Sequence, residues 1–216
     1  MPEPLVLPRL YPILDIDELE RRHLPPVEVA RCWLDAGLRL FQLRAKHTAS
    51  GAFLGLATEL ATVASASAAV FIINDRADIA RVSGAGGVHL GQDDLSPSGV
   101  RSFLGEKAIL GLSTHNEEQL ISALAQPVDY VAIGPVYRTS SKANPDPIVG
   151  IEGVERASAL ARALGRPLVA IGGITLETAA DVLRAGASSV AVISGLLDGT
   201  PDVRAKQFLA AVGANL

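Results

Sequence analysis

Short runs of apolar residues alternate along the chain with longer segments in which apolar positions recur every three or four residues. Most of the short runs are rich in Val, Ile and Leu on both faces, which is typical of parallel strands that helices cover. The predicted strands span Leu10–Leu14, Leu38–Leu43, Val70–Ile73, Gly87–Leu90, Ile109–Leu112, Tyr130–Gly134, Leu168–Ile171 and Val190–Ile193. The pattern therefore predicts eight parallel strands joined by helices.

The segments between the strands have the apolar spacing of amphipathic helices. The predicted helices span Val27–Ala36, Leu54–Ala64, Glu117–Leu124, Val154–Leu164 and Leu176–Ala185. Gly37 and Gly186 follow two of them as expected C-terminal caps. The connection over residues 135–150 is long and polar, and connections of that length are usually functional or mobile.

Eight strand–helix units without a linker predict an α/β fold, a single (β/α)8 TIM barrel over residues 1–216. A barrel of this kind needs about 200–250 residues, which this chain provides. The alternative is a doubly wound open sheet, which normally carries a glycine-rich loop after its first strand. Here Asp15-Ile16-Asp17-Glu18 follows that strand, and the sequence contains no Walker A or GxGxxG motif. The closed barrel is therefore favoured.

Composition limits the classes of function. Hydrophobic residues make up 49% of the chain and charged residues 19%, which favours a large buried core over disorder. The net charge of −4 provides no basic field for nucleic acid or an anionic membrane, so local groups must hold any anionic ligand. The single cysteine, Cys32, excludes a disulfide framework and is expected to be a packed apolar side chain. We expect no signal peptide and no membrane span, which leaves the cytoplasm as the expected compartment. A homo-oligomer is compatible with these properties.

Candidate chemistry is expected at the carboxyl ends of the strands, where the active sites of barrels lie. The second strand ends in Gln42-Leu43-Arg44-Ala45-Lys46, and alternation places Gln42, Arg44 and Lys46 on one side. Asp75 and Asp94 follow the third and fourth strands, so the two carboxylates can converge. Such a pair suits Mg²⁺, which is commonly bound by one or two carboxylates together with substrate phosphates. Taken alone, Asp94 is also a candidate helix N-cap.

The ends of the fifth and sixth strands are also polar. Ser113-Thr114-His115-Asn116 follows the fifth strand, and Thr114 or Asn116 should cap the next helix. A lone histidine such as His115 more often has a structural role than a catalytic one, and His89 is expected to be buried in the barrel wall. The run Thr139-Ser140-Ser141-Lys142 after the sixth strand indicates either a phosphate-binding loop or a flexible polar loop.

The seventh and eighth strands end in Gly172-Gly173 and Ile193-Ser194-Gly195. Phosphate sites in barrels frequently use the loops after these two strands. Glycine lets backbone N–H groups approach an anion, because no side chain stands in the way. These loops therefore predict a phosphate site.

In combination and in this order, the strand-end motifs resemble those of the thiamine-phosphate synthase family. The resemblance extends from Leu10 to Ser194. The motifs that carry it are Gln42-Leu43-Arg44-x-Lys46, Asn74-Asp75-Arg76, His89-Leu90-Gly91-Gln92-x-Asp94, Gly111-Leu112-Ser113-Thr114-His115, Gly134-Pro135-Val136-Tyr137 and Gly172-Gly173-Ile174. The resemblance implies a Mg²⁺-dependent transferase with two small phosphorylated substrates. Such an enzyme joins a hydroxymethylpyrimidine diphosphate to a thiazole phosphate, or its carboxylated form, and releases diphosphate.

The resemblance also implies which residues take part. For the pyrimidine diphosphate these are Gln42, Leu43, Arg44, Ala45, Lys46, Asn74, Ser113 and Lys142, of which Arg44, Lys46, Ser113 and Lys142 would be catalytic. For the thiazole phosphate they are Thr139, Ser140, Ser141, Gly173, Ile193 and Ser194, and Mg²⁺ would bind to Asp75 and Asp94. In the family the diphosphate is thought to leave first, so the step needs neutralisation of the leaving group more than a general base.

Three alternatives compete with this interpretation. A thiazole tautomerase on the same fold would lack the aspartate pair and the full Gln-x-Arg-x-Lys run, and both are intact here. A phosphosugar aldolase or isomerase needs a Schiff-base lysine on a strand or an acid/base pair, and the predicted strands contain no lysine, which argues against the aldolase. A non-catalytic phosphate-binding regulator would be expected to have lost Asp75, Asp94 or Lys142, and all three are present.

Overall fold

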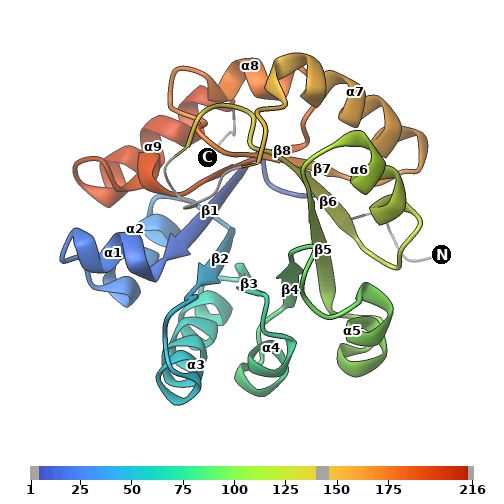
Figure 1. The fold of residues 1–216 in the computed structure, drawn as a ribbon. Helices are drawn as coiled ribbons and strands as arrows, with labels where there is room; N and C mark the ends of the chain where they lie inside the picture. Colours follow the sequence, from blue (N-terminus) through green and yellow to red (C-terminus); the bar gives the residue numbers. More distant parts are fainter. Residues whose placement is uncertain (1–4, 140–145, 214–216) are drawn as a thin grey trace.

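The computed structural model describes residues 5–139 and 146–213. Eight parallel strands form a closed barrel in sequence order, β1 to β8, and helices surround it (Figure 1). The strands are β1 (Leu10–Asp15), β2 (Leu40–Arg44), β3 (Val70–Asn74), β4 (Gly87–Leu90), β5 (Ile109–Thr114), β6 (Tyr130–Ile133), β7 (Leu168–Ile171) and β8 (Ser189–Val192). All eight predicted strands are confirmed, with ends within two residues of the predicted ones.

The helices that surround the barrel include every predicted one. They are α1 (Ile16–Arg21), α2 (Pro26–Asp35), α3 (Ser50–Ala66), α4 (Ala77–Ser83), α5 (Pro97–Leu104), α6 (Glu117–Leu124), α7 (Gly150–Ala163), α8 (Ala179–Arg184), the 3₁₀ helix η1 (Ser194–Leu197) and α9 (Pro201–Ala211). The predicted helices did not include α1, α4, α5, η1 or α9. α1, α4 and η1 are too short for a helical period to be clear, and α5 and α9 both begin at a proline, which suits the first turn of a helix. Within the described residues, no helix is long and apolar enough to cross a bilayer.

Alternation along the strands divides the core into two layers. Tyr11, Leu40, Ile72 and Tyr130 belong to an inner cluster that fills the barrel. Their neighbours in the strands point outward and pack against the helices, in a larger outer cluster that includes Leu10, Leu43 and Ile73. Because burial fixes the direction of each side chain, it also decides which strand-end residues face the mouth of the barrel.

Side-chain caps decide between the alternatives that the sequence left open. The Asn116 side chain accepts a hydrogen bond from the Gln119 backbone N–H at 2.9 Å, so Asn116 caps α6. Ser96 caps α5, with its hydroxyl 3.3 Å from the Gly99 nitrogen. The interpretation of Asp94 as the cap of that helix is therefore wrong. Gly37 and Gly186 have φ values of 107° and 103°, which suits their positions just past α2 and α8.

Candidate active site

A cavity of about 560 Å³ opens at the carboxyl ends of the strands. Its volume lies within the usual range for small-molecule sites, roughly 300–1,000 Å³. Of the residues predicted for the site, those that line it are Gln42, Arg44, Lys46, Asn74, Asp75, Asp94, Ser113, Thr139, Ile193 and Ser194. The predicted Ser140, Ser141 and Lys142 lie outside the described residues. Residues far apart in the sequence thus surround one cavity.

Two residues of the motif at the end of β2 point away from the cavity. Leu43 and Ala45 are buried in the outer cluster, between the barrel and its helices, and do not line the cavity. Gln42, Arg44 and Lys46, which alternate with them, do line it, as the spacing predicted. The side chains of Leu43 and Ala45 therefore act in packing, away from the position of a ligand.

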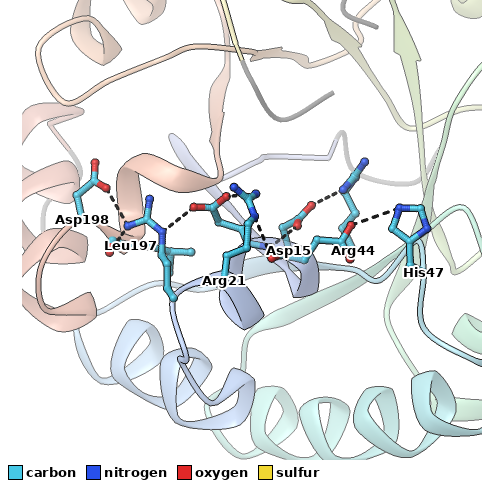
Figure 2. A network of polar contacts seen from close by, with 9 residues as sticks. Asp15, Arg21, Arg44, His47, Leu197 and Asp198 are labelled. Atoms are coloured by element: carbon cyan, nitrogen blue, oxygen red, sulfur yellow. Dashed lines mark hydrogen bonds and ion pairs between the residues drawn. The ribbon is translucent and has the colours of Figure 1, made fainter. Parts of the chain in front are cut away.

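Arg44 is held by an ion pair at the edge of the cavity. Its guanidinium donates to the carboxylate of Asp15 at the end of β1, and the two side chains point toward one another in Figure 2. Asp15 is only 4% exposed. Its other oxygen accepts a hydrogen bond from the Glu18 backbone N–H at 3.0 Å and so caps α1. The buried Asp15 carboxylate thus caps α1 and also orients Arg44, a cation that lines the cavity. Asp15 was not among the predicted site residues.

The same polar network continues from α1 to the loop after β8 (Figure 2). Glu18 pairs with Arg21 and with Arg22. The Arg22 guanidinium donates to the Leu197 carbonyl at 2.8 Å and to the Asp198 carboxylate at 3.0 Å. These contacts fasten α1 to η1, whose first residue is the cavity-lining Ser194.

An acidic pair, Asp75 and Asp94, lies beside Lys46. Asp75 follows β3 with a φ of 64°, a left-handed conformation that Asp tolerates better than most residues. Its backbone N–H donates to the His89 carbonyl at 2.8 Å, and its carboxylate lies 2.9 Å from the Lys46 ammonium. The Asp94 carboxylate accepts a hydrogen bond from the Gly91 N–H at 2.7 Å. Burial raises the pKa of Asp94, and the Gly91 hydrogen bond opposes this, while the neighbouring Asp75 carboxylate raises the pKa further.

The pair fits the ligand preference of Mg²⁺. Two neighbouring carboxylates destabilise each other, and a divalent cation between them would remove that repulsion. Among the described residues, no cluster of three or more His, Cys, Asp or Glu side chains is placed to hold a metal. A set of two carboxylates suits an ion that keeps other ligands, such as water and substrate phosphate, better than a closed structural zinc site.

The floor of the cavity holds a chain of five polar side chains, all of which line the cavity except Tyr130, which lies below them in the inner cluster. Gln42 contacts Tyr11, Tyr11 contacts Tyr130, Tyr130 contacts His89, and His89 contacts Ser113. His89 is buried, as predicted, but it also lines the cavity. We did not predict the two tyrosines as part of the site. A Cβ at Gly111 would lie 2.1 Å from the Tyr130 ring, so this glycine makes room for the ring, but no local sequence pattern indicates that contact.

The loops after β6, β7 and β8 form another part of the wall, through Thr139, Gly172, Ile193 and Ser194. Gly173 itself does not line the cavity, although it was predicted for the phosphate site. It has a φ of 67°, and a Cβ there would lie 2.4 Å from the Arg138 carbonyl oxygen. Gly173 thus lets the β7 loop pack closely against the loop that carries Thr139.

His115 lines the cavity at the junction of two loops. Its Nδ1 lies 2.7 Å from the Gly134 carbonyl oxygen, to which it donates, and 3.5 Å from the Asp146 carboxylate. Its backbone N–H donates to the Gln119 side chain at 2.8 Å. These contacts favour the structural role expected for a lone histidine, because they join the loop after β5 to both ends of the loop after β6.

Comparison with known proteins agrees with this arrangement. The family model described as thiamine monophosphate synthase matches residues 10–196. A thiamine-phosphate synthase of Koribacter versatilis is 45% identical over 207 residues, which cover 95% of this chain and 96% of that protein. One from Chlorobium phaeovibrioides is 45% identical over 174 residues, covering 80% and 81%. A solved structure, a thiamine phosphate pyrophosphorylase from Pyrococcus furiosus, matches with a TM-score of 0.82 and 29% identity over 95% of both chains. The chain therefore belongs to the thiamine monophosphate synthase family.

Proposed function

We propose that the protein is a transferase of thiamine biosynthesis, a thiamine-phosphate synthase. Its substrates would be a hydroxymethylpyrimidine diphosphate and a thiazole phosphate, and its products thiamine phosphate and diphosphate. The observation that carries the proposal is the convergence of Arg44, Lys46, Asp75 and Asp94 on one cavity. Cations and an acidic pair at one wall match a diphosphate and its metal, and family membership specifies the reaction.

Arg44 and Lys46 would bind the leaving diphosphate. A guanidinium has five N–H donors, so Arg44 can keep its bond to Asp15 and still contact an anion in the cavity. Because Asp15 fixes Arg44 before substrate arrives, little reorganisation is needed when charge develops on the leaving group. Lys142, which lies outside the described residues, would supply a further cation according to the family resemblance.

Asp75 and Asp94 would hold Mg²⁺, which when bound neutralises charge on the diphosphate. Lys46 contacts Asp75 in the structure, so it already lies at the edge of this site. Asn74 and Ser113 line the same wall and would contact the pyrimidine substrate. The thiazole phosphate would be bound by Thr139, Ile193 and Ser194 on the opposite loops, together with Ser140, Ser141 and the Gly173 loop. Orienting the two rings toward each other would contribute the rest of the acceleration.

The direct test is to mix both substrates with Mg²⁺ and to measure thiamine phosphate and diphosphate. We expect equal amounts of the two products. Folded protein that makes neither product, but isomerises a thiazole phosphate alone, would instead be a tautomerase. Binding of either substrate without any turnover would indicate a regulator.

A matched pair of variants tests the acidic pair. We expect Asp75→Asn to lower kcat/KM by at least about 100-fold, because it removes charge from the proposed metal site. Asp78→Asn is the control, since Asp78 lies on α4 of the same unit, is exposed, and pairs with Arg76, and neither of these two residues lines the cavity. Equal losses of activity in the two variants, or an Asp75→Asn defect that matches its loss of folded protein, would contradict the assignment.

A further inference from the structure

The hydrogen bonds on the cavity floor form one continuous chain of five side chains. The Gln42 amide nitrogen lies 3.0 Å from the Tyr11 hydroxyl, which lies 2.8 Å from the Tyr130 hydroxyl. The Tyr130 oxygen lies 2.9 Å from Nδ1 of His89, and Nε2 of His89 lies 2.8 Å from the Ser113 hydroxyl. The chain thus joins two proposed ligands of the pyrimidine substrate, Gln42 and Ser113, through three residues with no assigned role.

Both tyrosines have one proton each to donate. Burial raises the pKa of Tyr11 to about 12 and that of Tyr130 well above its usual value, so both phenols stay protonated at neutral pH. The tyrosines lie within the closed barrel, and both are almost wholly buried. A buried, protonated phenol can therefore donate to only one of its two neighbours in the chain and must accept from the other.

The Gln42 amide sets that direction. The contact between the two tyrosine hydroxyls has no direction of its own. Because the Tyr11 oxygen already accepts from the Gln42 N–H and its own proton needs an acceptor, that proton is directed to Tyr130. The Tyr130 proton is then directed to Nδ1 of His89, which must accept. A neutral imidazole that accepts at Nδ1 carries its proton on Nε2, and that proton points to Ser113. The Ser113 oxygen accepts it, so the hydroxyl proton of Ser113 is directed away from His89.

We propose that Tyr11, Tyr130 and His89 are positioning residues, which fix Ser113 as a hydrogen-bond donor toward the substrate. This inference rests on the proposed function, since it assumes that Ser113 contacts the pyrimidine diphosphate. The chain selects a substrate that presents an acceptor atom to Ser113 and disfavours one that presents a donor. Preorganisation of this kind lowers the cost of ordering the hydroxyl when the substrate binds.

Ring packing holds the side chains of this hydrogen-bond chain in place. The rings of His89 and Tyr130 stack with centroids 5.5 Å apart, and Tyr11 meets Tyr130 edge to face at 6.0 Å. Gly111 on β5 leaves the space that the Tyr130 ring occupies. A second hydrogen bond, from the Gln92 side chain to the Ser113 carbonyl at 2.6 Å, holds the serine backbone. Both the backbone and the hydroxyl oxygen of Ser113 are therefore held in place.

The first test measures the tautomer of His89 directly. Nitrogen-15 NMR of the whole, substrate-free protein at neutral pH distinguishes the Nε2–H tautomer, the Nδ1–H tautomer and the imidazolium, and the His89→Gln variant assigns the signal. We expect the Nε2–H tautomer. An Nδ1–H tautomer would mean that the chain runs in the opposite direction, and an imidazolium would mean that it has no direction. Either result overturns the proposal.

The second test uses Tyr130→Phe, which removes the hydroxyl that directs His89. We expect a mixture of His89 tautomers and a KM for the pyrimidine diphosphate raised about tenfold, the effect of losing one well-oriented hydrogen bond. Thr114→Val is the control, because it removes another buried hydroxyl of β5, which donates to the Ala132 carbonyl at 2.7 Å and takes no part in the chain. We expect it to leave both the tautomer and the KM unchanged.

The outcomes separate this inference from the proposed function. An active enzyme whose His89 is the Nδ1–H tautomer refutes the proposed direction of the hydrogen-bond chain and leaves the proposed function intact. A protein without synthase activity that has an Nε2–H His89 refutes the function alone. If Tyr130→Phe does not fold, the wild-type tautomer and Tyr11→Phe remain as tests, and an unchanged KM in folded Tyr11→Phe contradicts the proposal.

Discussion

Replacing Asp15 by asparagine should separate the two roles of this buried side chain. Asparagine is as good an N-cap as aspartate, so α1 keeps its cap, whereas the negative charge beside Arg44 is lost. Exposed ion pairs contribute up to about 1 kcal/mol, and removing one partner of a fully buried pair costs about 3–5 kcal/mol. The Arg44 side chain is 17% exposed and that of Asp15 5%. We therefore expect Asp15→Asn to lower the free energy of unfolding by about 2 kcal/mol, between these limits.

The kinetic effect of Asp15→Asn follows from the freedom that Arg44 gains. A charge-assisted hydrogen bond to the diphosphate is worth about 1.5–3 kcal/mol. Losing that bond would lower kcat/KM for the pyrimidine diphosphate by roughly ten- to a hundredfold. Steady-state kinetics with the thiazole phosphate at saturation measure this loss, and urea unfolding followed by circular dichroism measures the stability.

Two further variants complete this experiment. Asp15→Ala also removes the cap, so it should cost about 1 kcal/mol more than Asp15→Asn. Asp17→Asn is the control, since Asp17 lies in the first turn of the same helix and its contact to His47 is exposed, at 3.7 Å. Wild-type kinetics for Asp15→Asn would refute the argument that Asp15 positions Arg44. An equal kinetic loss in Asp17→Asn would show an unspecific effect of helix charge.

Three other predictions concern packing and metal. Leu43→Ala should cost about 2–5 kcal/mol of stability and leave the KM values of the folded fraction unchanged, as urea unfolding and kinetics can show, because Leu43 packs in the outer core. Gly173→Ala should lower the melting temperature more than Gly165→Ala and should raise the KM for the thiazole phosphate. Both glycines have positive φ, but only at Gly173 would the Cβ meet another loop. Chelation with EDTA should abolish product formation in the synthase assay, and added Mg²⁺ should restore it. The melting temperature should change little on chelation, because the Lys46 ammonium pairs with the Asp75 carboxylate when no metal is bound.

Periodicity made the barrel predictable, since each strand leaves a run of four to six residues that must be apolar on both sides. Alternation also placed Gln42, Arg44 and Lys46 correctly on the cavity side. The helix α1 was not predictable in this way, because six residues hold less than two turns. Its cap, Asp15, also belongs to β1, so its second role as the partner of Arg44 depends on strand pairing that a local pattern does not contain.

The run Gln42-Leu43-Arg44-Ala45-Lys46 shows how alternation refines a family motif. Resemblance assigned all five residues to the substrate as one block, but successive side chains of a strand face opposite sides. Leu43 and Ala45 are buried in the outer cluster for that reason, and alternation applied to every residue of the run would have placed them there. The chain on the cavity floor is a different case. Tyr11 and Tyr130 are 119 positions apart, and only closure of the barrel brings their hydroxyls to 2.8 Å. Inward-facing polar residues on non-adjacent strands are thus the feature that only the folded barrel reveals, and here they connect through His89 to Ser113, the residue proposed to contact the substrate.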